Sequence, residues 1–301
     1  MNTKKILFIV IFSILIAIHT AYAAAKINVF ACEPEWAALS KELGGSLVST
    51  FSATNVGQDP HYIQARPSLI AKIRKADLLV CSGAGLETGW LPVLLRKSAN
   101  SKVQPGQKGY FMATDTVKLL DKPTVLDRSM GDIHAAGNPH IQLDPRRIKI
   151  VVKKLSQRLQ QIDPQYSKEY AEKLANFKTR WDQAMKRWKE ETRELQGKAI
   201  IVHHNSWVYL QQWLKLNKVA ELEPKPGVPP SSSHLSALLK QVKKTPVDLI
   251  IYSSYQDPKA ALWLSEKTGI KAVAIPSTVN ENESLFQWMD HVIQLIKDNS
   301  K

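Results

Sequence analysis

Short apolar runs alternate with amphipathic stretches along most of the chain. "KINVFA" (26–31) precedes "PEWAALSKELGG" (34–45), "PSLIAKIRKA" (67–76) precedes "DLLV" (77–80), and "GYFMAT" (109–114) follows. Runs of continuous apolar residues separated by helical stretches are typical of a parallel sheet that helices cover on both faces. The first part of the chain therefore predicts an α/β domain.

A long helical segment interrupts this alternation. Asp144-Pro145 predicts a first helix start and Asp163-Pro164 a second, and Gly197 ends the second helix. About thirty residues at a rise of 1.5 Å give a rod of roughly 45 Å, long enough to run along two domains. Apolar residues recur in it at spacings of three and four, which predicts a core-facing stripe rather than a cofactor contact. The stripe comprises Tyr170, Leu174, Phe177, Trp181, Met185, Trp188, Thr192 and Leu195.

Beyond the long helix the α/β pattern returns. Apolar runs such as "KAIIVH" (198–203), "VDLIIYSS" (247–254) and "KAVAI" (271–275) again alternate with helical stretches, and a final helix begins near Ser284. The sequence thus predicts two doubly wound α/β lobes joined by one long rigid helix, with a ligand site in the cleft between the lobes. We place the N-terminal lobe at 24–163, the connecting helix at 164–196 and the C-terminal lobe at 197–301.

The first 23 residues have the order of a secretory signal peptide. Lys4 and Lys5 precede an apolar run that ends at Ile18, and the small-residue pattern Ala21-Tyr22-Ala23 follows. The run is too short to span a bilayer. We expect cleavage near Ala23/Ala24 and a periplasmic location, and because no Cys follows the cleavage site, we expect no lipid anchor.

The chain carries a formal net charge of +14. The leader contains two lysines and no acid, so the mature chain keeps +12. Such an excess is compatible with nucleic acid, with an anionic envelope surface or simply with solubility. No basic cluster is interleaved with aromatic residues, so we expect no nucleic-acid partner.

Cys32 and Cys81 are the two cysteines of the chain. Each follows a run that we interpret as a buried strand, and these strands are neighbours in a doubly wound sheet. An oxidising compartment permits a disulfide between them. Two buried free thiols are the alternative.

Histidines follow several of the expected strands. His61 comes directly after Pro60, His140 comes directly after Pro139 in "AAGNPHIQLDP", and His203 and His204 close the first strand of the second lobe. Pro stiffens the backbone and fixes the direction of the imidazole that follows it. Taken singly, each histidine is an ordinary surface or hydrogen-bonded residue. Their shared placement at strand ends predicts a metal site, and three imidazoles with one oxygen suit tetrahedral zinc.

Longer motifs across the mature chain resemble one known family. They are "DPHYIQARPS" (59–68), "SGAGLETGWL" (82–91), "GNPHIQLDP" (137–145), "VHHNSWVYL" (202–210), "LEPKPGVPPSSSHL" (222–235) and "DLIIYSSYQDPKAALWLSEKTGIKAVAIP" (248–276). The chain is similar to the zinc- and manganese-binding solute-binding proteins that serve ABC-type metal importers. The proline-rich segment 222–235 resembles the corresponding segment in a subgroup of periplasmic zinc-binding proteins.

This resemblance implies that His61, His140 and His204 are metal ligands. Much of the family supplies a fourth ligand as an Asp directly after the last strand, where this chain reads "AVAIPSTVNENES" (272–284) without an Asp. We favour Glu281 as the replacement, with Glu283 or a water molecule as alternatives.

The remaining mature histidines receive other roles. His203 should point to the opposite face of its strand from His204 and is taken as structural. His134, in "DIHAAGNPH", is expected to make a loop hydrogen bond. His234 and His291 are expected on helices without a metal role.

The implied function is binding of Zn²⁺ by a monomer and its delivery to an ABC-type membrane permease, without catalysis. A manganese carrier of the same family is the nearest alternative, although manganese prefers oxygen-rich ligand sets. An exported zinc-dependent hydrolase and a basic adhesin are alternatives from other classes. The sequence contains no HExxH pair, which argues against the hydrolase. We expect a small tilt of one lobe on metal binding, since the long helix resists hinge bending.

Overall fold

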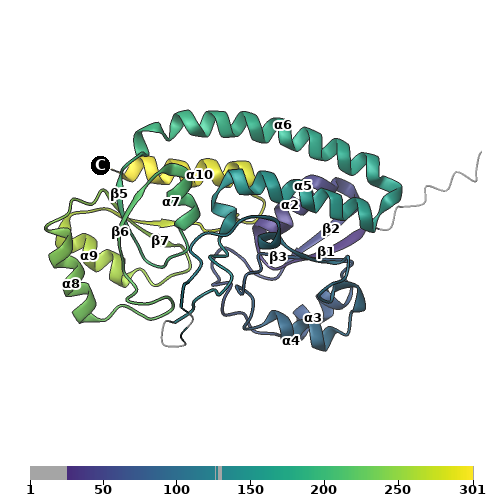
Figure 1. Ribbon diagram of the computed structural model, residues 1–301, viewed down its shortest axis with the longest axis horizontal. Coiled ribbons are helices and arrows are strands. Elements are labelled where there is room, and N and C mark those ends of the chain that lie inside the picture. The colour runs from purple at the N-terminus through teal and green to yellow at the C-terminus, as the bar shows by residue number, and fades with distance from the viewer. Residues whose placement is uncertain (1–25, 126, 128–130, 301) are drawn as a thin grey trace, which may run out of the picture.

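The computed structural model describes residues 26–125, 127 and 131–300. Two parallel sheets of four strands form the centres of two lobes (Figure 1). The first has the order β2-β1-β3-β4 and the second the equivalent order β6-β5-β7-β8. The strands are β1 Ile27–Ala31, β2 Val48–Ser52, β3 Leu78–Cys81, β4 Tyr110–Met112, β5 Ala199–Val202, β6 Asn217–Glu221, β7 Leu249–Ser253 and β8 Ala272–Ile275. The predicted fold of two parallel α/β lobes is confirmed.

Both faces of each sheet are covered, as continuous apolar strands require. In β1, Val29 and Ala31 pack into one apolar cluster, while Phe30 and the following residue, Cys32, pack into another on the opposite face. The covering helices of the N-terminal lobe are α2 Pro34–Gly44, α3 Pro67–Arg74, α4 Leu91–Ser98 and α5 Pro145–Ile162. Those of the C-terminal lobe are α7 Val208–Leu214, α8 Ser232–Val242, α9 Lys259–Thr268 and α10 Leu285–Asn299.

One apolar cluster continues from lobe to lobe. It includes Val29 of β1 and Ile200 of β5, together with Trp181 of the long helix α6, Ser167–Glu191. Figure 1 shows α6 running along both lobes, over α10 at one end and over α2 and α5 at the other. The lobes therefore share a core as well as a connecting helix.

The aromatic stripe of α6 forms part of this core. The rings of Phe177 and Trp181 stack at 5.1 Å, and both pack against Phe286 of α10. The Trp181 indole also donates to the carbonyl of Pro145, at the start of α5, at 2.9 Å. The α-helix is shorter than the 164–196 predicted, because 3₁₀ turns at Pro164–Tyr166 and Arg193–Leu195 flank it.

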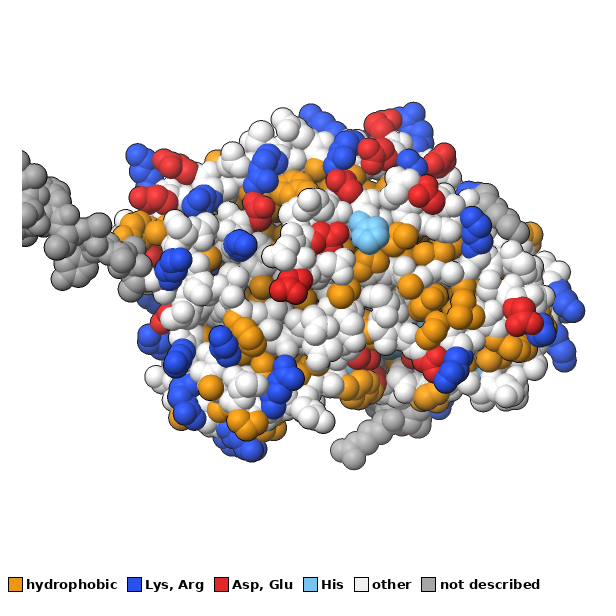
Figure 2. All heavy atoms as spheres, turned by 180° about the vertical axis from the view of Figure 1, so that it is seen from behind, with side chains coloured by type: hydrophobic (Ala, Val, Ile, Leu, Met, Phe, Trp, Pro, Cys, Tyr) orange, Lys and Arg blue, Asp and Glu red, His pale blue; other side chains and the backbone are white. Residues whose placement is uncertain are grey.

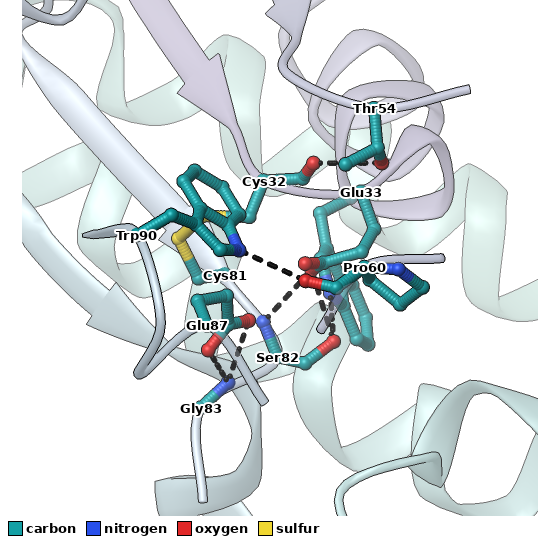
Figure 3. Close-up of a disulfide and its surroundings, with 10 residues drawn as sticks. Cys32, Glu33, Thr54, Pro60, Cys81, Ser82, Gly83, Glu87 and Trp90 are labelled. Atoms are coloured by element: carbon teal, nitrogen blue, oxygen red, sulfur yellow. Dashed lines mark hydrogen bonds between the residues drawn. A yellow bond between two sulfur atoms is a disulfide. The ribbon is translucent and has the colours of Figure 1, made fainter. Parts of the chain in front are cut away.

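Cys32 and Cys81 form a disulfide in the structure, with their Cα atoms 4.8 Å apart (Figure 3). It joins the carboxyl ends of the neighbouring strands β1 and β3. The predicted signal peptide and its cleavage point lie outside the described residues. Across the described ranges, no helix combines the length and the apolar character needed to cross a membrane.

Candidate metal centre

Three loops bring His61, His140 and His204 together. His61 lies between β2 and α3, His140 precedes α5, and His204 follows β5 of the other lobe. A ring nitrogen from each lies within 4.8 Å of the others. The side chains of all three are at least nine-tenths buried, so the cluster lies inside the cleft between the lobes. His61 and His204 lie in loops that follow β2 and β5, at the carboxyl ends of the strands, where parallel α/β sheets bind ligands.

The loop that carries His61 is held by two neighbours. Asp59 Oδ1 accepts from the His61 backbone N–H at 2.9 Å and lies 2.7 Å from His61 Nδ1. The Trp90 indole donates to the carbonyl of Pro60 at 2.8 Å, as Figure 3 shows beside the disulfide. An N–H at Nδ1 that donates to Asp59 leaves the lone pair of His61 on Nε2.

His140 is positioned by contacts that join the two lobes. Its backbone N–H donates to Asn138 Oδ1 at 3.1 Å. Asn138 donates to the carbonyl of Asn205 at 2.6 Å and its carbonyl accepts from the Tyr209 hydroxyl at 2.6 Å. His140 Nε2 is buried and has no hydrogen-bond partner. Burial, followed by the neighbouring imidazoles, holds the pKa of His140 well below its ordinary value, so this ring stays neutral.

His204 is fixed by a carboxylate of its own lobe. Its Nδ1 lies 2.7 Å from Glu223 Oε2, which also accepts from the Gly227 backbone N–H at 2.9 Å. Burial lowers the pKa of His204, but the hydrogen bond and charge of Glu223 outweigh it and raise the pKa above its ordinary value. Carboxylates that hold Nδ1 in this way direct Nε2 toward a bound metal and make it a stronger donor.

His134 is a fourth member of the cluster, which the sequence analysis assigned to a loop hydrogen bond. Its Nε2 lies 3.2 Å from His61 Nε2. Two nitrogens each about 2.0–2.1 Å from a tetrahedral zinc ion are about 3.3–3.4 Å apart, so this spacing matches a pair of zinc ligands. Burial, followed by the charge of His61, lowers the pKa of His134 to about 4. The signal in the sequence was its position in the same loop as His140.

The carboxylates proposed for the fourth position are not brought to the cluster. Glu281 is exposed in the loop between β8 and α10 and does not belong to the group of ligand atoms around His61. Glu283 instead accepts from the backbone and side-chain N–H groups of Asn280, both at 2.9 Å. The structure places neither carboxylate among the clustered ring nitrogens, and the identity of the fourth ligand stays a prediction.

His203, His234 and His291 are not among the residues whose ring nitrogens come together with those of His61, His140 and His204. His203 is 6% exposed and its Nε2 is 3.8 Å from Glu223 Oε1. His234 Nε2 lies 3.1 Å from the carbonyl of Glu221. His291 lies on α10 near Glu283, with its side chain about half exposed.

The arrangement is a group of closely spaced imidazoles, each of which can offer a ring-nitrogen lone pair. Such lone pairs repel unless a proton or a cation lies between them, and a dication with nitrogen preference relieves the repulsion best. Zinc takes four such donors in a tetrahedron, whereas manganese favours oxygen ligands. The cluster therefore suits a borderline-soft transition-metal ion.

A solved structure has the same fold. A crystal structure of ZnuA superposes with a TM-score of 0.78 over 92% of this chain and 100% of that chain, at 20% sequence identity. The likeness extends over both lobes and the helix that joins them. At this level of identity it establishes the fold alone.

Curated relatives are metal-transport proteins. SloC of Streptococcus mutans serotype c, named a metal ABC transporter substrate-binding lipoprotein, is 25% identical over 84% of this chain and 81% of its own length. PsaA of Streptococcus anginosus, a manganese ABC transporter substrate-binding lipoprotein, is 22% identical over 92% and 90%. AdcA of Streptococcus pneumoniae, a zinc-binding lipoprotein, is 23% identical over 87% of this chain. The match covers 52% of the length of AdcA.

These names contradict one prediction. The sequence predicts an exported chain with no lipid anchor, because no Cys follows the expected cleavage site. SloC, PsaA and AdcA are all named lipoproteins. The names of these relatives therefore contradict the prediction of no lipid anchor.

The family model for the zinc-uptake complex component A, ZnuA, matches residues 29–299, nearly the whole of the two lobes. The match includes all four histidines of the cluster and both sheets. This chain is a member of the ZnuA family of metal-binding proteins that serve ABC transporters.

Proposed function

We propose that the protein binds a single Zn²⁺ ion at His61, His140 and His204, with His134 as the fourth ligand, and delivers it to an ABC-type permease. The observation that carries the proposal is that ring nitrogens of His61, His140 and His204, from loops of both lobes, lie within 4.8 Å of one another, while His134 Nε2 lies 3.2 Å from His61 Nε2. The ion is cargo, so the site has to bind it tightly without carrying out a reaction on it.

The choice of zinc over manganese rests on the donor atoms. Asp59 and Glu223 each hold an imidazole at 2.7 Å, so these carboxylates orient ligands instead of binding the ion themselves. A site with four nitrogens favours zinc, because manganese prefers oxygen. Relatives of both kinds exist, AdcA for zinc and PsaA for manganese, so manganese is the second candidate.

Calorimetric titration of chelator-stripped protein with Zn²⁺ and with Mn²⁺ tests the proposal. We expect one Zn²⁺ per chain and weaker binding of Mn²⁺. Replacing His61, His140 or His204 by Ala should each weaken Zn²⁺ binding at least about 100-fold, because the buried site loses one of its donors. His134→Ala should weaken it less if a water molecule takes the vacated position.

His291→Ala is the matched control, since this half-exposed imidazole of α10 lies outside the cluster. Undiminished Zn²⁺ binding by any of the three core variants would refute the ligand set. Tighter binding of Mn²⁺ than of Zn²⁺ would favour the second candidate. Hydrolysis of ester or phosphoester substrates that a chelator abolishes would instead favour an enzyme.

A further inference from the structure

A hollow of about 190 Å³ opens at the histidine cluster, between the two lobes. Both His61 and His204 line it, so it leads directly to two of the proposed ligands. At about 30 Å³ per water molecule it has room for roughly six, so a dication can enter with its hydration water. We call it the entrance hollow.

The walls of the entrance hollow are acidic. Asp59 and Asp132 line it from the N-terminal lobe, and Glu223 and Asp257 line it from the C-terminal lobe. Among the described residues of its wall there is no Lys or Arg. This is unexpected in a chain with a net charge of +14, which repels cations at long range.

A second feature of the wall also points to a cation. His203 lines the entrance hollow and is 6% exposed, and its Nδ1 has no hydrogen-bond partner. The other ring nitrogen, Nε2, lies 3.8 Å from Glu223 Oε1, so the Nδ1 lone pair is left without a hydrogen bond. The wall thus combines negative charge with a nitrogen donor outside the cluster itself.

Another hollow that borders the cluster has a different charge. It has a volume of about 640 Å³ and is lined in part by His134 and His204. Its wall includes Lys122 and Lys225 beside Asp121, Asp132 and Glu221, so the positive charge offsets part of the negative charge there. The entrance hollow therefore has the larger excess of negative charge of the two.

We propose that the entrance hollow is the route by which the metal ion reaches the histidines, and that its carboxylates set the rate of capture. This inference rests on the proposed function. The carboxylates attract the dication into a narrow opening with low-dielectric walls, where field lines are focused.

Asp257 and Lys259 lie side by side at the mouth of the entrance hollow and carry opposite charges, so their substitutions should change the association rate in opposite directions. Asp257 is 61% exposed at the mouth and does not contact the proposed ligands directly. Its Oδ1 accepts a hydrogen bond from the Lys259 backbone N–H at 3.0 Å. The side-chain oxygen of Asn can accept the same hydrogen bond, so Asp257→Asn removes only the charge. Lys259 Nζ lies 3.3 Å from Asp257 Oδ2 and offsets its charge. Removing either charge changes the field at the mouth without altering the ligands.

The measurement is stopped-flow mixing of metal-free protein with Zn²⁺, read by competition with a chromophoric chelator. At low ionic strength, Asp257→Asn should slow association about threefold and Lys259→Gln should accelerate it by a similar factor, with dissociation unchanged. Both effects should shrink as salt rises from about 0.01 M to about 0.15 M, since the Debye length falls from about 30 Å to about 8 Å.

Asp298→Asn is the control. Asp298 lies near the end of α10, where its carbonyl accepts from Lys271, the residue just before β8, at the sheet edge opposite the cleft. It should leave the association rate unchanged. Equal rates for wild type, Asp257→Asn and Lys259→Gln, or an effect confined to dissociation, would overturn the inference while leaving Zn²⁺ binding intact. If wild-type protein retains no Zn²⁺, the proposed function fails, and the inference fails with it.

Discussion

Two buried glutamates near the disulfide, Glu33 and Glu87, make the folding stability depend on pH. Glu87 is 3% exposed, and both of its oxygens accept from the Gly83 backbone N–H at 3.1 Å (Figure 3). Glu33, 3% exposed, accepts from the backbone N–H and hydroxyl of Ser82. Burial raises the pKa of Glu87 from 4.5 to about 7, and burial together with the charge of Glu87 raises that of Glu33 well above its usual value.

Glu87 should make the metal-free protein less stable as pH rises. Between pH 4.5 and about 7 the unfolded chain loses this proton while the folded chain keeps it, so folding stability falls across that window. Glu87→Gln replaces the ionisable carboxyl group by an amide that does not titrate. It should therefore be more stable than wild type at pH 8, by up to about 3 kcal/mol, with little gain near pH 4.5.

Urea denaturation of metal-free protein at pH 5 and pH 8 measures this difference. Glu172→Gln, on the exposed side of α6, serves as the control and should change stability equally at both pH values. A Glu87→Gln effect that is the same at pH 5 and pH 8 would contradict the prediction.

At the residue scale, the sequence predicted part of the site. His61, His140 and His204 follow strands or a proline-stiffened turn, and the carboxyl ends of parallel strands meet at one edge, so their convergence could be expected. His134 and Glu281 lie within long loops, where no periodicity fixes the direction of a side chain. Their sequence positions therefore do not decide whether either side chain reaches the site, and the ligand roles of both stay predictions.

At the scale of elements, the disulfide fastens two strands that lead into the site. Cys32 directly follows β1 and Cys81 ends β3, and the residues after them, Glu33 and Ser82, hydrogen-bond to each other. The bond closes a loop with a sequence separation of 49 residues. A cross-link of this length restricts the unfolded chain considerably.

Replacing both cysteines by Ala should lower the free energy of unfolding by up to about 4 kcal/mol, according to the loop-closure treatment of disulfides. The same loss should appear when wild-type protein is unfolded in the presence of a reductant. The double variant should not respond to the reductant, which is the internal control. Equal stability of wild type with and without reductant would show that the bond contributes nothing.

The long helix shows which features of an element its sequence determines. The spacing of Phe177, Trp181 and Trp188 correctly predicted a buried face, because a 3.6-residue period is a property of the whole segment. The helix ends were misplaced, because Asp163-Pro164 and the residues after Glu191 form 3₁₀ turns. Local hydrogen bonds decide such ends, including the Thr192 hydroxyl that donates to the carbonyl of Trp188 at 2.7 Å.

At the scale of the whole molecule, positive charge and the metal site are separated. Figure 2, seen from behind, shows Lys and Arg gathered on the lower part of the N-terminal lobe, where α3 and α4 lie. The exposed cations of these two helices and of the residue after α3 are Lys72, Arg74, Lys75, Arg96 and Lys97. The acidic entrance hollow lies in the cleft, away from the tips of these helices.

The shared core predicts a stiff molecule. Arg180 of α6 pairs with Glu42 of α2 at 2.6 Å, and Arg187 of α6 pairs with Asp290 of α10 at 2.7 Å, so the helix is fastened to both lobes. Small-angle scattering should show a change in the radius of gyration of roughly 1 Å or less when Zn²⁺ is added. Trp181→Ala removes a core anchor of this helix and should enlarge the change.

A large compaction of wild-type protein on Zn²⁺ addition would contradict this stiffness. The division of the chain at residues 163 and 197 stays a prediction, because the continuous apolar cluster gives no clear boundary between the lobes.

The four imidazoles of the proposed metal site come unequally from the two halves of the chain. His61, His134 and His140 belong to the first half of the chain, and His204 belongs to the second. A cargo ion held by all four would lose a single bond if the halves moved apart, and would stay with the first half. Unloading would then proceed by stepwise transfer from that half, and a partner that receives the ion would have to compete with three nitrogens at once.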